Sequence, residues 1–388
     1  VLRDSQGGFA GNTGWIWTVE PNGRWMRQTF FNATVRKADQ TGQLDAASLK
    51  ALAGVLQQKD IATLPANIGG KPMVNPHVVT LTFGKQTSEL VLPTGANPPK
   101  VAAGTPIAAG CGDQSANVLG GGLVDPGVVF DTSGTASVFA TVIDRFGTDT
   151  TYRCLMTCPH VVPGLYFPMA YVAGGGLNLR WFRDTLSPRE KAEWEGLGVN
   201  PYDELAKAAG AIAPGSEKLI FLPHLSGRNT PNDPDMRGAF LGLTWRHEKP
   251  HLVRAIMESI AYEYALYLRA VREIAPGYDP KFAVNIGGGA RSDVLRQIKA
   301  DTLGLEYRCM DREEFGTLGA AIVAGHAVGL FPDLRETARR FAGNTRVVAE
   351  ARPEITAAYE PYVDSYIDAL ETLSPLFKRI SHRLSVET

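Results

Sequence analysis

The main structural signal in this 388-residue sequence is a set of glycine-rich turns, each of which follows an apolar segment. Glycine lets the backbone turn tightly after a strand, and the N–H groups of such a turn can bind a phosphate. The chain has such turns at residues 110–114 (GCGDQ), 133–137 (SGTAS) and 287–293 (GGGARSD). A single turn of this kind is more often structural, so the interpretation depends on their order and spacing. Together they predict an α/β module with a nucleotide site.

The segments before these turns are predicted to be strands. Residues 106–109 (PIAA) predict a short strand that places Asp113 on a glycine-flanked bend, where an acid can face a cleft. Residues 128–132 predict a strand that enters the second turn and returns as another strand. Residues 282–286 (FAVNI) predict a strand whose turn opens a helix, and a helix N-terminus attracts anions.

Three common enzyme motifs are absent. The chain has no G-x-x-x-x-G-K-[ST] segment, and its glycine runs do not fit G-x-G-x-x-G. Ser133 and Ser226 each lack the glycine two positions earlier that a G-x-S-x-G turn requires. A P-loop NTPase, a standard dinucleotide dehydrogenase and a serine hydrolase are therefore disfavoured.

Charge and cysteine usage narrow the class of partner. Lys and Arg number 39 against 40 Asp and Glu, so the chain lacks the positive charge that attracts nucleic acids or anionic membranes. We find no apolar run near the ~20 residues that span a bilayer. The four cysteines, which show no disulfide-framework spacing, are Cys111, Cys154, Cys158 and Cys309. We expect a cytoplasmic protein with a small molecule or a protein as partner.

Residues 1–100 form a separate module of pattern ββαββ. Residues 14–31 predict a hairpin that turns at Asn22 and Gly23. Asp45 caps a helix with leucine at helical spacing, which Pro65 ends, and residues 79–92 predict a second hairpin. The composition of residues 93–106 is that of a linker.

This first module offers no catalytic arrangement, and its single histidine, His77, is interpreted as a loop residue after Asn75 and Pro76. The start at residues 7–11 (GGFAG), the order of elements and the helix end at residues 64–65 resemble the emfourin-type protease-inhibitor fold. That resemblance assigns no role to an individual residue.

The most specific pattern lies further on. Residues 238–243 (GAFLGL) are followed, after a gap of seven residues, by residues 251–258 (HLVRAIME). This is similar to the second signature of the FGGY carbohydrate kinases. Residues 221–231 (FLPHLSGRNTP) resemble a flanking loop of that family, and the three glycine turns fall in family order. The resemblance covers roughly residues 105–380 and is strongest to the xylulokinase-like branch.

The resemblance implies that residues 101–388 form an ATPase lobe of the actin/hexokinase/Hsp70-like (ribonuclease H-like) class. It implies that a phosphoryl group is transferred from ATP to a hydroxyl of a sugar or polyol, most of all a xylulose-like ketose. Mg²⁺ would be held by phosphate oxygens and waters. Asp113 would be the general base and would contact the substrate with Gln114. Gly134 and Thr135 would hold the terminal phosphates. The residues that would border the rest of the nucleotide are Gly227, Gly288, Gly289, Ala290 and Asp293.

Other candidate residues are interpreted as structural. Residues 251–274 predict a helix in which His251 and Glu258 serve the helix start and packing. Cys154, Cys158 and His160 could suggest zinc, but three ligands at this spacing disfavour it, and we predict no protein metal site. The glycines at 174–176 are interpreted as structural, and residues 355–384 as a packed helix.

The chain departs from the family pattern in one respect. A complete member begins with a lobe that carries D-x-G-T-[ST] and most sugar contacts, and this motif is absent. The chain also starts without Met, as expected for a processed or truncated sequence. Three hypotheses stay open: a kinase that needs a missing lobe from elsewhere or from an oligomer, a nucleotide-binding module without catalysis, and a protease-inhibitor-like module joined to a degenerate kinase lobe.

Overall fold

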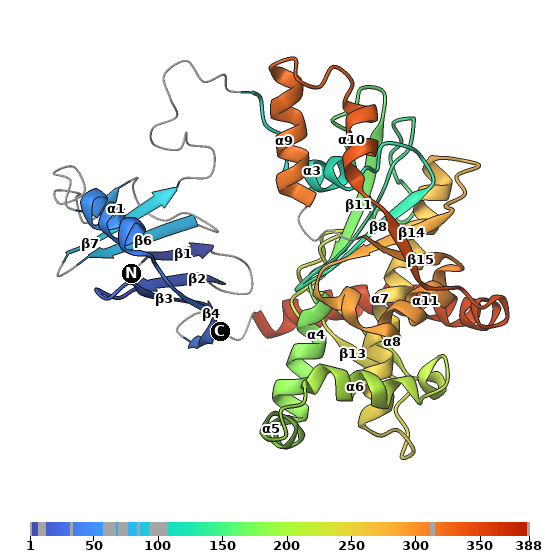
Figure 1. Cartoon of the computed structure of the whole chain (residues 1–388). Helices are drawn as coiled ribbons and strands as arrows, with labels where there is room; N and C mark the ends of the chain where they lie inside the picture. Colours follow the sequence, from blue (N-terminus) through green and yellow to red (C-terminus); the bar gives the residue numbers. More distant parts are fainter. Residues whose placement is uncertain are drawn as a thin grey trace. The chain divides into compact units, whose positions relative to one another are not determined.

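The computed structural model describes residues 2–6, 13–31, 34–56, 67–68, 77–83, 86–92, 108–310 and 315–385. The chain divides into two compact units, Val1–Thr105 and Pro106–Thr388 (Figure 1). Within the described ranges, no helix is long and apolar enough to cross a membrane.

The first unit is a sheet of order β4-β3-β2-β1-β6-β7-β5 with one described helix, α1 (Ala46–Leu56). Neighbouring strands are antiparallel, except that β5 runs parallel to β7. The strands are β1 (Leu2–Gln6), β2 (Thr13–Val19), β3 (Arg24–Phe31), β4 (Thr34–Gln43), β5 (Asn67–Ile68), β6 (His77–Phe83) and β7 (Gln86–Leu92).

Both predicted hairpins of this unit are confirmed. The first pairs Val19 with Trp25 across a turn in which Gly23 has a φ of +84°, a value that glycine adopts without strain. The predicted cap is also confirmed, because the Asp45 carboxylate accepts a hydrogen bond from the Ser48 N–H at 2.7 Å. The predicted helix end at Pro65 lies outside the described residues.

The ββαββ pattern was incomplete. The structure adds β1, β4 and β5, and His77 begins strand β6 instead of lying in a loop. Strand β4 (TVRKADQTGQ) is polar along most of its length, and residues 35–43 are exposed or half-buried, so no buried face imposes an alternating pattern.

The second unit has a mixed sheet of order β10-β11-β9-β8-β14-β15-β16, in which β14 runs parallel to β8 and β15. Its strands are β8 (Val128–Ser133), β9 (Ser137–Thr141), β10 (Met156–Pro159), β11 (Tyr166–Val172), β14 (Phe282–Ile286), β15 (Glu306–Met310) and β16 (Thr345–Ala349). A two-stranded sheet is formed by β12 (Ile220–Leu222) and β13 (Ala239–Leu241).

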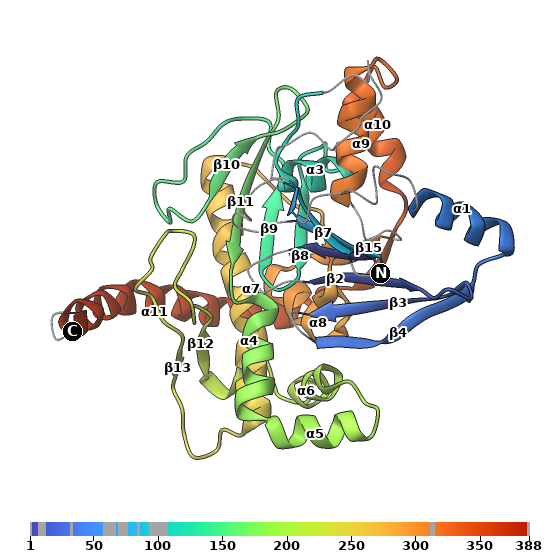
Figure 2. The same cartoon turned by 90° about the vertical axis from the view of Figure 1, so that its left-hand side faces the viewer.

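Helices pack on both faces of this sheet (Figures 1 and 2). The helices are α3 (Asp113–Gly120), α4 (Gly175–Trp181), α5 (Pro188–Gly196), α6 (Pro201–Gly210), α7 (Lys249–Ile274), α8 (Asp293–Leu303), α9 (Phe315–Ala327), α10 (Leu334–Ala342) and α11 (Pro353–Ser385). Strand β8 shows the layering, because Phe130 packs with α3, α9 and α10 while the neighbouring Val129 belongs to the core of α7, α8 and α11. This is the predicted α/β architecture.

Helix α7 is the central element of its layer. It begins with a capping box between Glu248 and His251, which confirms the predicted role of His251. Glu258 is fully buried and accepts hydrogen bonds from Arg254 at 2.7 Å and from the Tyr359 hydroxyl of α11 at 2.8 Å. The predictions that Glu258 serves packing and that the chain ends in a packed helix are therefore confirmed.

Candidate functional site

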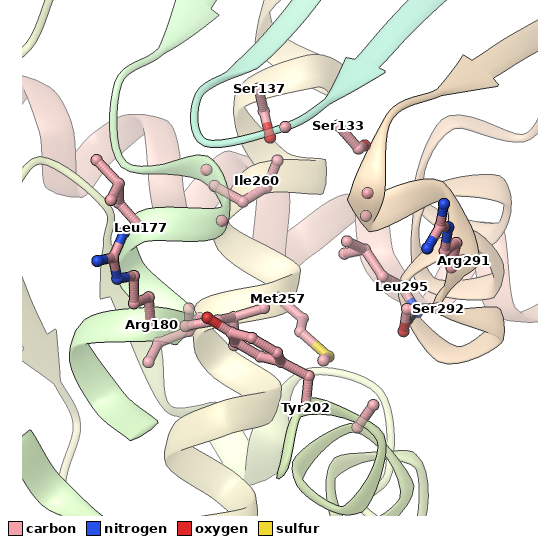
Figure 3. Close-up of a pocket in the computed structure, with 18 of the residues that line it drawn as sticks. Ser133, Ser137, Leu177, Arg180, Tyr202, Met257, Ile260, Arg291, Ser292 and Leu295 are labelled. Atoms are coloured by element: carbon pink, nitrogen blue, oxygen red, sulfur yellow. Dashed lines mark hydrogen bonds between the residues drawn. The ribbon is translucent and has the colours of Figure 1, made fainter. Parts of the chain in front are cut away.

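A pocket of about 830 Å³ lies where the parallel strands β8 and β14 reach their carboxyl ends (Figure 3). Ligands of α/β sheets commonly bind at such strand ends, beyond the sheet edge. Its walls come from the turn between β8 and β9, the start of α4, the start of α6, one face of α7 and the turn between β14 and α8.

The β8–β9 turn is joined backbone to backbone to the start of α4. The Gly176 N–H donates to the Gly134 carbonyl at 3.0 Å, and the Leu177 N–H donates to the Thr135 carbonyl at 3.2 Å. A Cβ on Gly176 would lie 2.6 Å from the Gly134 carbonyl oxygen, so this approach requires glycine. The predicted strand–turn–strand at 128–137 is confirmed.

The β14–α8 turn packs against the same strand end. Gly287 has a φ of +89°, and a Cβ there would lie 2.7 Å from the Ser133 carbonyl oxygen. Gly288 differs, because a Cβ on it would meet no atom within 4 Å. Ser292 then caps α8 by accepting the Leu295 N–H at 3.3 Å. The predicted strand, glycine turn and helix are confirmed here too.

A buried ion pair lies beneath both turns. The Lys299 ammonium is 2.7 Å from the Asp131 carboxylate and also donates to the Ser133 hydroxyl at 2.7 Å. Lys299 is 1% exposed and Asp131 is 0% exposed. Burial lowers the pKa of Lys299, and the Asp131 carboxylate opposes that lowering.

The other end of the pocket is mainly apolar. Figure 3 shows Tyr202 beside Met257, with Arg180 on the same side and Arg291 and Ser292 across the opening. The Arg183 guanidinium lies 4.6 Å from the centre of the Tyr202 ring, on α6. Partial burial raises the pKa of the Tyr202 phenol, which is therefore neutral at physiological pH. An aromatic ring with aliphatic neighbours suits a planar heterocycle.

The predicted site residues do not all meet here. Gly134, Thr135, Gly288 and Gly289 line the pocket. Ala290, Asp293 and Gly227 do not line the pocket. Ala290 is buried, and the Asp293 carboxylate pairs with Arg296. Gly227 has a φ of +92° and lies against Pro234.

Asp113 lies outside this lining as well, and its predicted setting was wrong. Ala108 and Ala109 have no regular structure, while Pro106 and Ile107 fall outside the described residues. Asp113 is instead the exposed first residue of α3, where its carboxylate accepts the Gln114 N–H at 2.8 Å. A helix N-terminus favours a negative charge, so this is a stable place for a carboxylate.

Sequence reasoning missed several lining residues. The glycines at 174–176 were interpreted as structural only, yet Gly175 and Gly176 form part of the pocket wall. Their signal was a glycine run that comes soon after the apolar residues 166–172 (YFPMAYV). Tyr202 had no such signal, because no motif surrounds it. Arg180 follows the glycine run in a segment that was interpreted as structural.

Both ring nitrogens of His160 form hydrogen bonds with the backbone. Its Nε2 donates to the Leu123 carbonyl at 3.0 Å, and its Nδ1 accepts the Val162 N–H at 2.9 Å. Burial lowers the pKa of this imidazole to about 4. Burial also raises the pKa of the Cys154 thiol. Among the described residues, no group of three His, Cys, Asp or Glu side chains is placed to hold a metal ion.

Comparison with known proteins agrees with this architecture. The model of the FGGY family of carbohydrate kinases, C-terminal domain, matches residues 128–328, slightly more than half of the chain. A gluconokinase from Bacillus subtilis is 34% identical over 254 residues, which are 64% of this chain and 47% of that protein. A xylulose kinase from Staphylococcus epidermidis is 28% identical over 304 residues, 77% of this chain and 57% of that protein.

Solved structures show the same relationship. The ligand-bound xylulose kinase from Lactobacillus acidophilus superposes with a TM-score of 0.60 at 27% identity, over 68% of this chain and 51% of that one. The fold is thus that of the actin/hexokinase-like sugar kinases. The chain spans about half the length of the curated relatives it matches. The chain belongs to the FGGY family of carbohydrate kinases.

Proposed function

We propose that residues 101–388 bind ATP in the pocket between the β8–β9 and β14–α8 turns and take part in phosphorylating a hydroxyl of a sugar, sugar acid or polyol. The observation that carries this proposal is the convergence of the two predicted glycine turns on one pocket beside an apolar wall. The names of the relatives, gluconokinase and xylulose kinase, suggest gluconate and a xylulose-like ketose as acceptors.

The glycine end of the pocket would receive the phosphates. Gly134, Thr135 and Gly288 bring backbone close to the cavity, and N–H groups that such turns do not use internally attract phosphate oxygens. The Gly134 N–H is used internally, because it donates to the Ala136 carbonyl at 2.9 Å. The N-terminus of α8 adds the positive end of its dipole beside Ser292. Phosphoryl transfer requires mostly positioning and charge stabilisation, which these groups provide.

The apolar end would receive the adenosine. Tyr202 from α6 offers a flat ring on which a base can stack, and Met257 from α7 adds an apolar, water-excluding side chain beside it. Mg²⁺ would arrive with ATP, held by phosphate oxygens and waters, and would neutralise charge on the transferred group. This fits the donor set, because the nearby Asp131 is fully buried and paired with Lys299.

Asp113 is our candidate for the general base, as the family resemblance implies. It is exposed at the start of α3, so its carboxylate is accessible to a hydroxyl. Asp113 and the pocket lining are separate, so catalysis requires the acceptor hydroxyl to be held between them. Gln114 follows Asp113 and is proposed to contact the same substrate.

The test has two parts. Calorimetric titration with ATP and ADP is expected to show binding, and no binding at millimolar nucleotide would contradict the nucleotide site. ADP release is then measured with ATP, Mg²⁺ and gluconate, xylulose or glycerol, for the natural chain and Asp113→Asn. Acceptor-dependent ADP release that Asp113→Asn abolishes would support the kinase reaction.

A non-catalytic nucleotide-binding module is the second candidate. It is favoured by the separation of Asp113 from the pocket lining. Tight ADP binding with no acceptor-dependent turnover in either variant is the result that would select it.

A further inference from the structure

The ion pair of Lys299 and Asp131 is unusual for its complete burial. Moving two charges out of water costs several kcal/mol per ion, so such a pair persists only with good geometry and further hydrogen bonds. The geometry is good: the ammonium and the carboxylate are 2.7 Å apart. Asp131 also accepts the Tyr264 hydroxyl at 2.8 Å, and the Lys299 ammonium lies 4.6 Å from the centre of the Tyr264 ring.

The Ser133 hydroxyl connects the pair to the pocket. Ser133 lines the pocket, and its Oγ donates to Asp131 at 2.9 Å while it accepts from Lys299 at 2.7 Å. Asn285 of β14 donates to the same oxygen at 3.2 Å. The hydrogen bonds from Asn285 and Lys299 come from β14 and α8, so these two elements and β8 are tied together at Ser133.

Ser133 also sets the distance between the β8–β9 turn and the β14–α8 turn, which together are called the phosphate turns. Its carbonyl oxygen would be 2.7 Å from a Cβ on Gly287, and its Cβ would be 2.8 Å from a Cβ on Gly289. The β14–α8 turn therefore rests directly on Ser133, and the β8–β9 turn begins at the following residue. A shift of Ser133 would move both turns.

We infer that Lys299 and Asp131 are positioning residues that fix the two phosphate turns through the Ser133 hydroxyl, so that the backbone N–H groups already point at the nucleotide phosphates before binding. This rests on the proposed nucleotide site. Preorganisation of this kind improves affinity by removing the ordering cost at binding. The effect is expected at the phosphate end, because the pair reaches the turns there through Ser133. It contacts α7 through Tyr264, which does not line the pocket as Tyr202 and Met257 do.

The experiment compares ADP with adenosine as calorimetric probes of the full chain. Lys299→Met alone would leave a buried carboxylate without its partner and could unfold the unit. The variants are therefore Ser133→Ala, which removes only the connecting hydroxyl, and the double change Asp131→Asn with Lys299→Met, which removes both charges. Arg339→Met is the control, because Arg339 pairs with Asp125 at the surface and neither residue lines the pocket.

The inference expects both variants to bind ADP more weakly by about tenfold or more, which corresponds to about 1.4 kcal/mol. Adenosine affinity is expected to change less than about twofold, and the control is expected to bind both probes like the natural chain. Equal losses for the two probes, or unchanged ADP binding, would overturn the inference by making the pair a purely structural element. Failure of the natural chain to bind ADP would instead remove the proposed site itself.

Discussion

The adjacent glycines Gly288 and Gly289 allow a test in which an added methyl group should weaken ADP binding at one position and lower the stability of the fold at the other. On Gly288 the added Cβ meets no atom within 4 Å. On Gly289 it lies 2.8 Å from the Ser133 Cβ and 3.2 Å from the Ser133 carbonyl oxygen. Neither glycine has a positive φ, so alanine is compatible with the backbone at both positions.

These distances set the expected free energies of unfolding. Gly289→Ala overpacks a rigid strand end and should cost about 1–3 kcal/mol. Gly288→Ala should be neutral or stabilise by about 0.4–1 kcal/mol, because alanine restricts the unfolded chain. At Gly288, however, the methyl group would occupy space proposed for a phosphate and should remove a charge-assisted hydrogen bond of about 1.5–3 kcal/mol.

Thermal unfolding and ADP calorimetry on the full chain measure both effects. Gly289→Ala should lower the melting temperature by about 2–4 °C for each kcal/mol lost. Gly288→Ala should keep its melting temperature and bind ADP about tenfold or more weakly. The reasoning is refuted if Gly288→Ala destabilises as much as Gly289→Ala, or if it binds ADP like the natural chain.

Three further outcomes are expected. Burial lowers the pKa of His160 from 6.5 to about 4. As the pH falls from about 6.5 to about 4, the unfolded chain therefore binds a proton at His160 that the folded chain does not bind, and the folded state loses stability. In urea unfolding between pH 7 and 4, His160→Gln should lose about 3 kcal/mol less stability than the natural chain. Glu263→Gln leaves the Arg228 charge unpaired in the core and should cost about 3–5 kcal/mol in urea unfolding at pH 7, and a loss below about 1 kcal/mol would contradict this. Tyr202→Leu should weaken adenosine and ADP equally in calorimetry, by about 1–3 kcal/mol as for other base stacking, whereas a loss confined to ADP would place the base elsewhere.

Local sequence identified the parts of the site that local chemistry determines. The turns at Gly134 and Gly288 follow apolar strands directly, so pattern and structure agree there. Asp113 was placed at a strand end because a short apolar run preceded it, but four residues carry too little periodicity to separate a strand from an irregular segment.

The rest of the site depends on contacts between distant segments. Lys299 appears in the sequence as an ordinary helix lysine, and only the packing of α8 on β8 shows that it pairs with Asp131, 168 residues away. Tyr202 likewise gains its meaning from the packing of α6 near α7. Long-range pairing of this kind leaves no signal in a single sequence.

Two of the tyrosines of α11, Tyr359 and Tyr366, have a consequence for the folding of the second unit during synthesis. Glu258 and Glu263 of α7 are fully buried, and they accept the hydroxyls of Tyr359 and Tyr366 at 2.8 and 2.6 Å. The partners are 101 and 103 residues apart in the chain. At ribosomal rates of about 5–20 residues per second, at least about five seconds pass between the synthesis of the two glutamates and that of their tyrosine partners. Until α11 emerges, these carboxylates lack those partners, so we expect the nascent second unit to stay open and accessible to proteases.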